Sequence, residues 1–151
     1  MTVVFPGVPT MRLSATRLSA TALLCLLFLF SACASGAGKG EKLQKAQYAY
    51  SAAIRWGDFE GAWTMVDPAY REAHPMTEAE FERYKQIQVS SYRDGAAEAG
   101  KTEAARAVEI GVINRHTMAE RSLRYTEHWR YDPRAKTWWV SNGLPDFWAG
   151  E

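Results

Sequence analysis

The chain has 151 residues, with 18 basic and 17 acidic side chains and a formal net charge of +1. This length suits a single domain and leaves no room for an ordinary two-domain enzyme. The aromatic content of 13% is too high for a disordered chain. The balanced charge argues against a nucleic-acid-binding protein, which normally carries a concentrated basic excess.

Residues 1–32 have the pattern of a targeting segment. Two arginines precede an almost unbroken apolar run over residues 20–30, and no acidic residue occurs in this part of the chain. A helix that spans a bilayer needs about 20 apolar residues, so this run is too short for a permanent span. We therefore expect a signal peptide that is removed, with its start at either Met1 or Met11.

Phe30, Ser31, Ala32 and Cys33 stand at the end of this segment and resemble the lipobox of bacterial lipoproteins. Phe30 departs from the usual pattern, which prefers Leu at that position. In that family the signal peptide is cut before the Cys, whose thiol receives a diacylglyceryl group. The resemblance implies lipidation of Cys33. The alternative is an ordinary secretory signal cut after Ala34, which would release a soluble periplasmic or secreted protein.

The residues that follow Cys33 predict where an anchored protein would be sorted. In lipoproteins an Asp directly after the Cys commonly causes retention in the inner membrane, whereas here Ala34 and Ser35 follow. The resemblance thus implies the periplasmic face of the outer membrane. The small residues over 33–40 predict a flexible tether, followed by a single domain over residues 41–151. That domain contains no Cys, so it must fold without a disulfide.

Helical patterns occupy the first half of this domain. Apolar residues recur at three- and four-residue steps over residues 41–56, and Gly57 ends the pattern. Asp58 is a suitable N-cap for a short second helix. Asp67-Pro68 begins another short turn, and residues 77–80 (Thr-Glu-Ala-Glu) form a capping box before a third helix.

Alternating apolar and polar residues indicate strands in the second half. The expected strands are residues 87–92, 108–112, 123–131 and 137–141. Asp94-Gly95 marks a turn or bulge, and residues 132–136 connect the last two strands as a hairpin. Helices followed by a run of antiparallel strands predict an α+β fold, with the N-terminal helices packed on a curved antiparallel sheet of about four strands.

This arrangement resembles the nuclear transport factor 2-like (cystatin-like) family over most of residues 41–142. The resemblance rests on the long first helix, the junction Trp-Gly-Asp-Phe-Glu-Gly-Ala-Trp over residues 56–63, and the late strand with Trp-Trp-Val at residues 138–140. It implies a cone-shaped fold with an open end that can hold a ligand. The family includes isomerases, dehydratases, cyclases, protein-docking modules and bacterial lipoproteins, so the fold does not give the function.

Enzymes of this family carry proton-transferring groups inside the cone, and Glu127 is the best candidate for such a group. It alternates in register with Tyr125 and Trp129, which we expect to line the pocket with it. A carboxylate among aromatic side chains is suited to act as a general base. The alternative is that strand twist turns Glu127 outward or that an Arg pairs with it. His116, at the end of a strand, is a second weak candidate, and His128 should point to the opposite face.

No cofactor or metal is expected. Three scattered His and a Cys-free domain make a zinc site improbable, and the sequence contains no phosphate-binding Gly loop, nucleophile elbow or dinucleotide fingerprint. Trp138 and Trp139 are consecutive, so a regular strand sends them to opposite faces. The outward ring of this pair is a candidate contact for a protein partner.

Two hypotheses follow. The first is a non-enzymatic, membrane-tethered envelope domain that binds a protein partner or a small hydrophobic ligand. The second is a small cofactor-free enzyme that uses Glu127, and His116 with it, for proton transfer on a hydrophobic ligand in the cone. An open pocket with Glu127 inside would favour the enzyme, whereas a cone filled by its own side chains would exclude it. A homodimer through the open sheet face is compatible with either hypothesis.

Overall fold

The structure, a computed structural model, describes residues 34–149, with side chains from Gly38 onward. The described residues from Gly38 onward form one compact unit. The expected signal peptide, the lipobox and Cys33 lie outside the described residues, so these expectations stay predictions. Within residues 34–149, no helix combines the length and the apolar character that crossing a membrane requires.

Four helices form the first half of the described chain. Their bounds are α2 Ala34–Trp56, α3 Phe59–Thr64, α4 Pro68–Ala73 and α5 Glu78–Tyr84. The expected N-caps are confirmed: Gly61 N donates to Asp58 Oδ1 at 2.8 Å, and Thr77 and Glu80 form a reciprocal capping box. Pro68 occupies the first turn of α4, where its missing N–H costs no hydrogen bond.

Helix α2 begins at Ala34, so residues 34–40 are helical where the small residues suggested a flexible tether. Contacts with the sheet explain why the helix extends so far. Lys39 O accepts a hydrogen bond from Trp138 Nε1 at 3.0 Å, and the Lys39 ammonium lies 4.6 Å from the ring centroid of Tyr131. These two contacts hold the helix at Lys39 in place, since a helix in a protein is stabilised mainly by tertiary packing.

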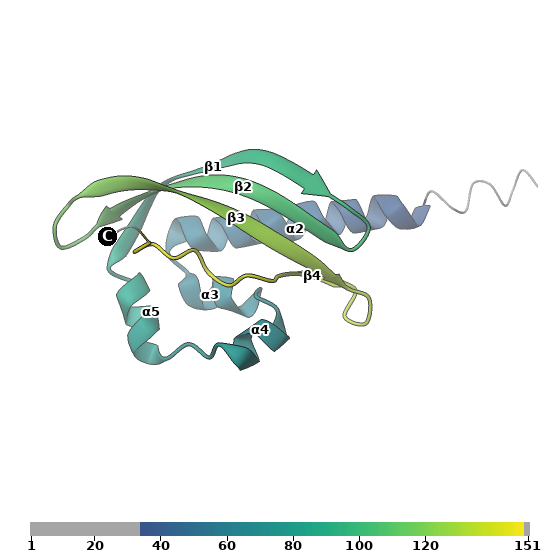
Figure 1. Cartoon of the computed structure of the whole chain (residues 1–151), viewed down its shortest axis with the longest axis horizontal. Helices are drawn as coiled ribbons and strands as arrows, with labels where there is room; N and C mark the ends of the chain where they lie inside the picture. The colour runs from purple at the N-terminus through teal and green to yellow at the C-terminus, as the bar shows by residue number, and fades with distance from the viewer. Residues whose placement is uncertain (1–33, 150–151) are drawn as a thin grey trace, which may run out of the picture. The chain divides into compact units, whose positions relative to one another are not determined.

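Four strands form one antiparallel sheet in the order β1-β2-β3-β4. Their bounds are β1 Ile87–Ala99, β2 Glu103–Asn114, β3 Glu120–Asp132 and β4 Thr137–Val140. The predicted fold class, α+β with helices packed on a curved antiparallel sheet, is therefore confirmed, and the sheet curves over α2 (Figure 1). The bulge expected at Asp94-Gly95 is present as a register shift between Asp94 and Ala97, but β1 continues past it to Ala99.

Side chains from α2 and from the inner face of the sheet fill the core. Tyr50 and Ile54 of α2 are fully buried, and the Tyr50 ring meets the Trp129 ring edge-on at 5.7 Å between centroids. The segment after β4 runs back over the helices and inserts Phe147, also fully buried, against Phe59 and Tyr84. Each large apolar side chain buried in this way contributes roughly 1.5–3 kcal/mol to stability.

Candidate functional site

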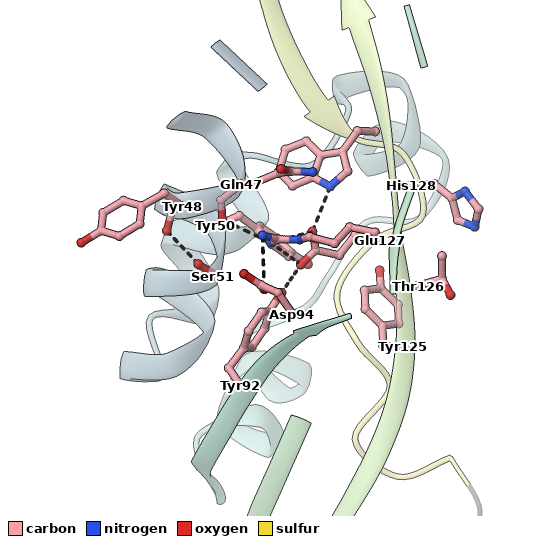
Figure 2. A network of polar contacts seen from close by, with 12 residues as sticks. Gln47, Tyr48, Tyr50, Ser51, Tyr92, Asp94, Tyr125, Thr126, Glu127 and His128 are labelled. Atoms are coloured by element: carbon pink, nitrogen blue, oxygen red, sulfur yellow. Dashed lines mark hydrogen bonds and ion pairs between the residues drawn. The ribbon is translucent and has the colours of Figure 1, made fainter. Parts of the chain in front are cut away.

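Glu127 lies on the inner face of β3, as the alternation predicted, and its side chain has no exposed surface. In Figure 2 it points toward α2, whereas His128 points away on the other side of the strand. The register places Glu127 opposite Arg106 of β2, whose side chain is only 9% exposed. The structure therefore contains a buried carboxylate and a buried guanidinium as cross-strand neighbours.

Three side chains donate hydrogen bonds to the Glu127 carboxylate. Arg106 donates through Nε to Oε2 and through Nη2 to Oε1, each at 3.0 Å. Trp129 Nε1 donates to Oε2 at 2.9 Å, and the Tyr92 hydroxyl donates to Oε1 (Figure 2). Each carboxylate oxygen thus accepts two hydrogen bonds, which uses the roughly four lone-pair sites that an ionised carboxylate offers.

This saturation decides what Glu127 can do chemically. A general base needs a free lone pair within hydrogen-bond reach of the proton that it removes. Both oxygens of Glu127 are occupied by protein donors, and no solvent reaches the side chain. Of the two alternatives drawn from the sequence, the structure shows the one in which an Arg pairs with the carboxylate.

Arg106 links this carboxylate to two further elements. Its Nη1 lies 3.3 Å from Asp94 Oδ1 of β1, and its Nη2 donates to Gln47 O of α2 at 3.4 Å. The sequence analysis missed Arg106, although a signal was present: Arg106 alternates in register with Val108 and Ile110. A charged residue in line with inward-facing apolar positions predicts a buried partner of opposite charge.

Three other tyrosines donate hydrogen bonds from their hydroxyls to backbone carbonyls in the segment after β4. Tyr50 and Tyr125 donate to Gly143 O at 3.2 and 2.9 Å, and Tyr84 donates to Pro145 O at 3.0 Å. Burial raises the pKa of Tyr50 and Tyr125 well above the usual value near 10, and the neighbouring Glu127 charge raises it further. These phenols are fixed donors to the chain that follows β4, so this part of the interior is occupied by the protein's own groups.

The other predicted site residues lie elsewhere. His116 is exposed in the turn between β2 and β3, where its backbone N–H donates to Asn114 Oδ1 at 2.9 Å, and it is not brought together with Glu127. Trp138 and Trp139 do point to opposite faces: Trp138 is 3% exposed in the core, and Trp139 is half-buried on the outer face. Only Trp139 can therefore present a surface to a partner.

A cleft of about 440 Å³ lies among the short helices and the segment after β4, and sequence patterns did not predict it. We call it the aromatic cleft, and its main lining side chains are Trp63, Tyr70, His74, Arg83, Tyr84 and Trp148. Glu80, Asp146 and Gly143 also border it. Its walls come from α3, α4, α5 and the segment after β4, which meet only in the folded chain.

Among the described residues, no group of three or more His, Cys, Asp or Glu side chains is arranged to hold a metal ion. Two places in the described part of the chain are chemically distinctive, the closed network around Glu127 and the open aromatic cleft. The network consists of paired charges that solvent does not reach, and the cleft consists of aromatic rings with polar groups at its border.

No protein-family model and no curated protein matches the chain. Its fold is similar to that of a SEC-C motif containing protein from Rhodopseudomonas palustris, with 14% identity, a TM-score of 0.52, and coverage of 64% of this chain and 72% of that one. A SEC-C motif containing protein from Psychrobacter arcticus is 11% identical over 64% and 57% of the two chains, with a TM-score of 0.48. A member of the NTF2-like family from Streptomyces avermitilis, whose name suggests a dehydratase, is 14% identical over 69% and 93%, with a TM-score of 0.42. At these identities the likeness concerns the fold alone.

Proposed function

We propose that this chain is a lipoprotein of the bacterial envelope, anchored through Cys33, whose domain binds a partner or ligand and does not catalyse a reaction. The observation that carries the non-enzymatic role is the saturation of Glu127, the best candidate base, by Tyr92, Arg106 and Trp129. A carboxylate in that state has no free lone pair for a substrate proton, and solvent does not reach it.

Placement on the periplasmic face of the outer membrane rests on the sequence. Its support is the lipobox resemblance at Cys33, the Ala34-Ser35 pair after it, and a body that folds without Cys. The binding role rests on the aromatic cleft and on the half-buried Trp139, which are surfaces that a partner or ligand can reach.

The anchor is tested by labelling cells that express the full chain with radioactive palmitate. We expect the wild-type protein to incorporate label and the Cys33→Ser variant to incorporate none. Fractionation of the same cells should place the wild-type protein with the outer membrane. A mature N-terminus that begins at an unmodified Ser35 would instead support the secreted alternative.

The closed interior is tested by coupling of carboxyl groups with a water-soluble carbodiimide, mapped by mass spectrometry. Glu109 is the matched control because it lies on the neighbouring strand β2 with a side chain that is 42% exposed. We expect Glu109 to be modified and Glu127 to stay unmodified in the folded protein. If Glu127 reacts as fast as Glu109, its site is open and the proton-transfer enzyme becomes the better hypothesis.

A further inference from the structure

The side of α2 that does not face the core is another open surface. We call it the outer face of α2, and its main exposed side chains are Lys42, Lys45, Tyr48, Arg55 and Trp56. Trp56 is 87% exposed and Tyr48 is 76% exposed, and the described part of the chain exposes one other large hydrophobic side chain, Met118. Figure 2 shows Tyr48 pointing away from Glu127. The exposed aromatic surface of this domain is therefore concentrated on one helix.

The two exposed rings belong to a single stripe along α2. Lys45, Tyr48, Ala52 and Trp56 follow one another at three- and four-residue steps, which places them on the same side of a helix. The fully buried Tyr50 lies on the other side, toward the sheet. Packing within the domain thus uses one side of α2 and leaves the stripe to solvent.

The charged side chains beside this stripe are mostly basic. Lys42, Lys45 and Arg55 are exposed, and Glu41 is the only acidic residue of α2. Lys42 and Arg55 each donate to a backbone carbonyl at 3.1 Å, which leaves their charge uncompensated. None of the three basic side chains forms an ion pair with a carboxylate of the described residues. The outer face of α2 therefore complements an anionic surface.

The proposed anchor holds this face within reach of a bilayer. Gly38, the first residue of the compact unit, follows Cys33 by five residues, and five residues of chain span at most about 18 Å. Lys42 lies about one helical turn after Gly38. An acylated Cys33 thus keeps the basic side chains of α2 near lipid head groups at all times, which favours a bilayer over a protein partner as the occupant of this face.

From these observations we propose that the outer face of α2 lies on an anionic lipid surface, beside the acyl chains of the anchor. The inference rests on the lipid anchor proposed above and names the surface that the domain contacts. Lys42, Lys45 and Arg55 pair with lipid phosphates. Tyr48 and Trp56 pack at the boundary between head groups and acyl chains, where rings with one apolar and one polar part are favoured.

The experiment uses the full chain, lipidated in cells, purified and reconstituted into vesicles. Because the domain contains no Cys, one added Cys can carry an environment-sensitive dye. Ala49→Cys places the dye on the outer face of α2, and Ala79→Cys in α5 is the matched control, since both are exposed helical alanines. We expect a blue shift of the dye at residue 49 alone, on vesicles of phosphatidylethanolamine and phosphatidylglycerol but not on phosphatidylcholine.

Charge variants of the dye-labelled protein test the role of the basic side chains. Lys45→Gln removes one positive charge from the outer face of α2, whereas Arg115→Gln removes one from the exposed turn between β2 and β3. On the anionic vesicles we expect Lys45→Gln to shift the equilibrium of the dye about fivefold toward water, and Arg115→Gln to leave it unchanged. Salt at about 1 M should release the face while the anchor keeps the protein on the vesicle.

Two results would overturn the lipid-surface proposal: a dye at residue 49 that reports water on both kinds of vesicle, or equal effects of Lys45→Gln and Arg115→Gln. Palmitate labelling of Cys33 decides the anchor separately. If the protein carries no lipid, the labelled protein is mixed with the anionic vesicles and sedimented. Binding that depends on Lys45 would then support the outer face of α2 without the anchor, and absence of binding would overturn both.

Discussion

Arg106 and Glu127 are opposite each other in the register of β2 and β3, and the Arg106 guanidinium donates to both oxygens of the Glu127 carboxylate. Removal of one partner from a buried pair leaves the other charge uncompensated, which typically costs about 3–5 kcal/mol. We therefore expect Glu127→Ala to lower the free energy of unfolding by about that amount. Urea denaturation followed by tryptophan fluorescence measures the change.

The outer face of the neighbouring strand pair, β1 and β2, supplies the control. Glu109 of β2 lies 3.6 Å from Arg93, and the side chains of Arg93 and Glu109 are 74% and 42% exposed. Exposed ion pairs contribute little, so Glu109→Ala should change the free energy of unfolding by no more than about 0.5 kcal/mol. Similar losses for Glu109→Ala and Glu127→Ala would mean that Glu127 is not the buried centre of the network.

The buried tyrosines predict a loss of stability in alkali. Burial raises the pKa of Tyr92 above its usual value near 10, and the charge and hydrogen bond of Glu127 raise it further. The stability linked to this shift is fully present below pH 10 and is lost as the pH rises toward the folded-state pKa, because the unfolded chain then releases a proton that the folded chain keeps. The free energy of unfolding should fall by up to about 1.4 kcal/mol per pH unit for each such tyrosine.

Tyr92→Phe tests this linkage through the slope of the free energy of unfolding against pH, and not through the midpoint of a single urea transition. Urea unfolding between pH 9 and pH 11 gives the number of protons released on unfolding at each pH. We expect the variant to release about one proton fewer than the wild type at the alkaline end, whatever its stability at neutral pH. An unchanged slope would show that Tyr92 ionises at the same pH in both states.

Local patterns in the sequence were sufficient to predict that the helices and strands exist and that Glu127 points inward, because capping residues and alternation act over a few residues. They made the strands too short, since β1 continues to Ala99 and β2 begins at Glu103. The same alternation extended one step before residue 108 would have revealed Arg106 as an inward-facing charge. Local patterns could not predict where α2 begins, because Lys39 is held by Trp138 and Tyr131, which lie far away in the chain.

The aromatic cleft could not be predicted for a related reason. Trp63 and Tyr84 look like ordinary core residues in their own helices, and Trp148 lies in a segment without periodicity. Their common location depends on how α3, α5 and the chain after β4 pack, and Phe147 sets that packing by inserting against Phe59 and Tyr84. Such long-range placement leaves no spacing signal in a single sequence.

We expect substitutions of Asp67 to lower stability in steps, because its two carboxylate oxygens have separate roles. Oδ1 accepts from Ala69 N at 3.0 Å as the N-cap of α4, and Oδ2 accepts from Arg130 Nε at 2.6 Å. Asp67→Asn keeps a capping oxygen and loses the ion pair, whereas Asp67→Ala loses both. We expect the Ala variant to be less stable than the Asn variant by about 1 kcal/mol in thermal or urea unfolding. Equal stabilities would mean that the cap contributes nothing.

Gly143 and Gly57 form a matched pair that separates backbone strain from a steric clash. Both have positive φ, at +81° and +73°, so an Ala at either position is strained to a similar extent. A Cβ at Gly143 would lie 2.9 Å from atoms of the Tyr70 ring, whereas at Gly57 the nearest atom, on Phe59, is 3.8 Å away. We expect Gly57→Ala to lower the free energy of unfolding by about 1 kcal/mol, and Gly143→Ala to lower it clearly more, as measured by urea unfolding.

Because Tyr70 lines the aromatic cleft, Gly143→Ala should also alter the fluorescence of Trp63, which contacts Tyr70 edge-on, and Gly57→Ala should not. Equal costs for the two variants would show that Tyr70 moves aside freely and that this wall of the cleft is not held in place.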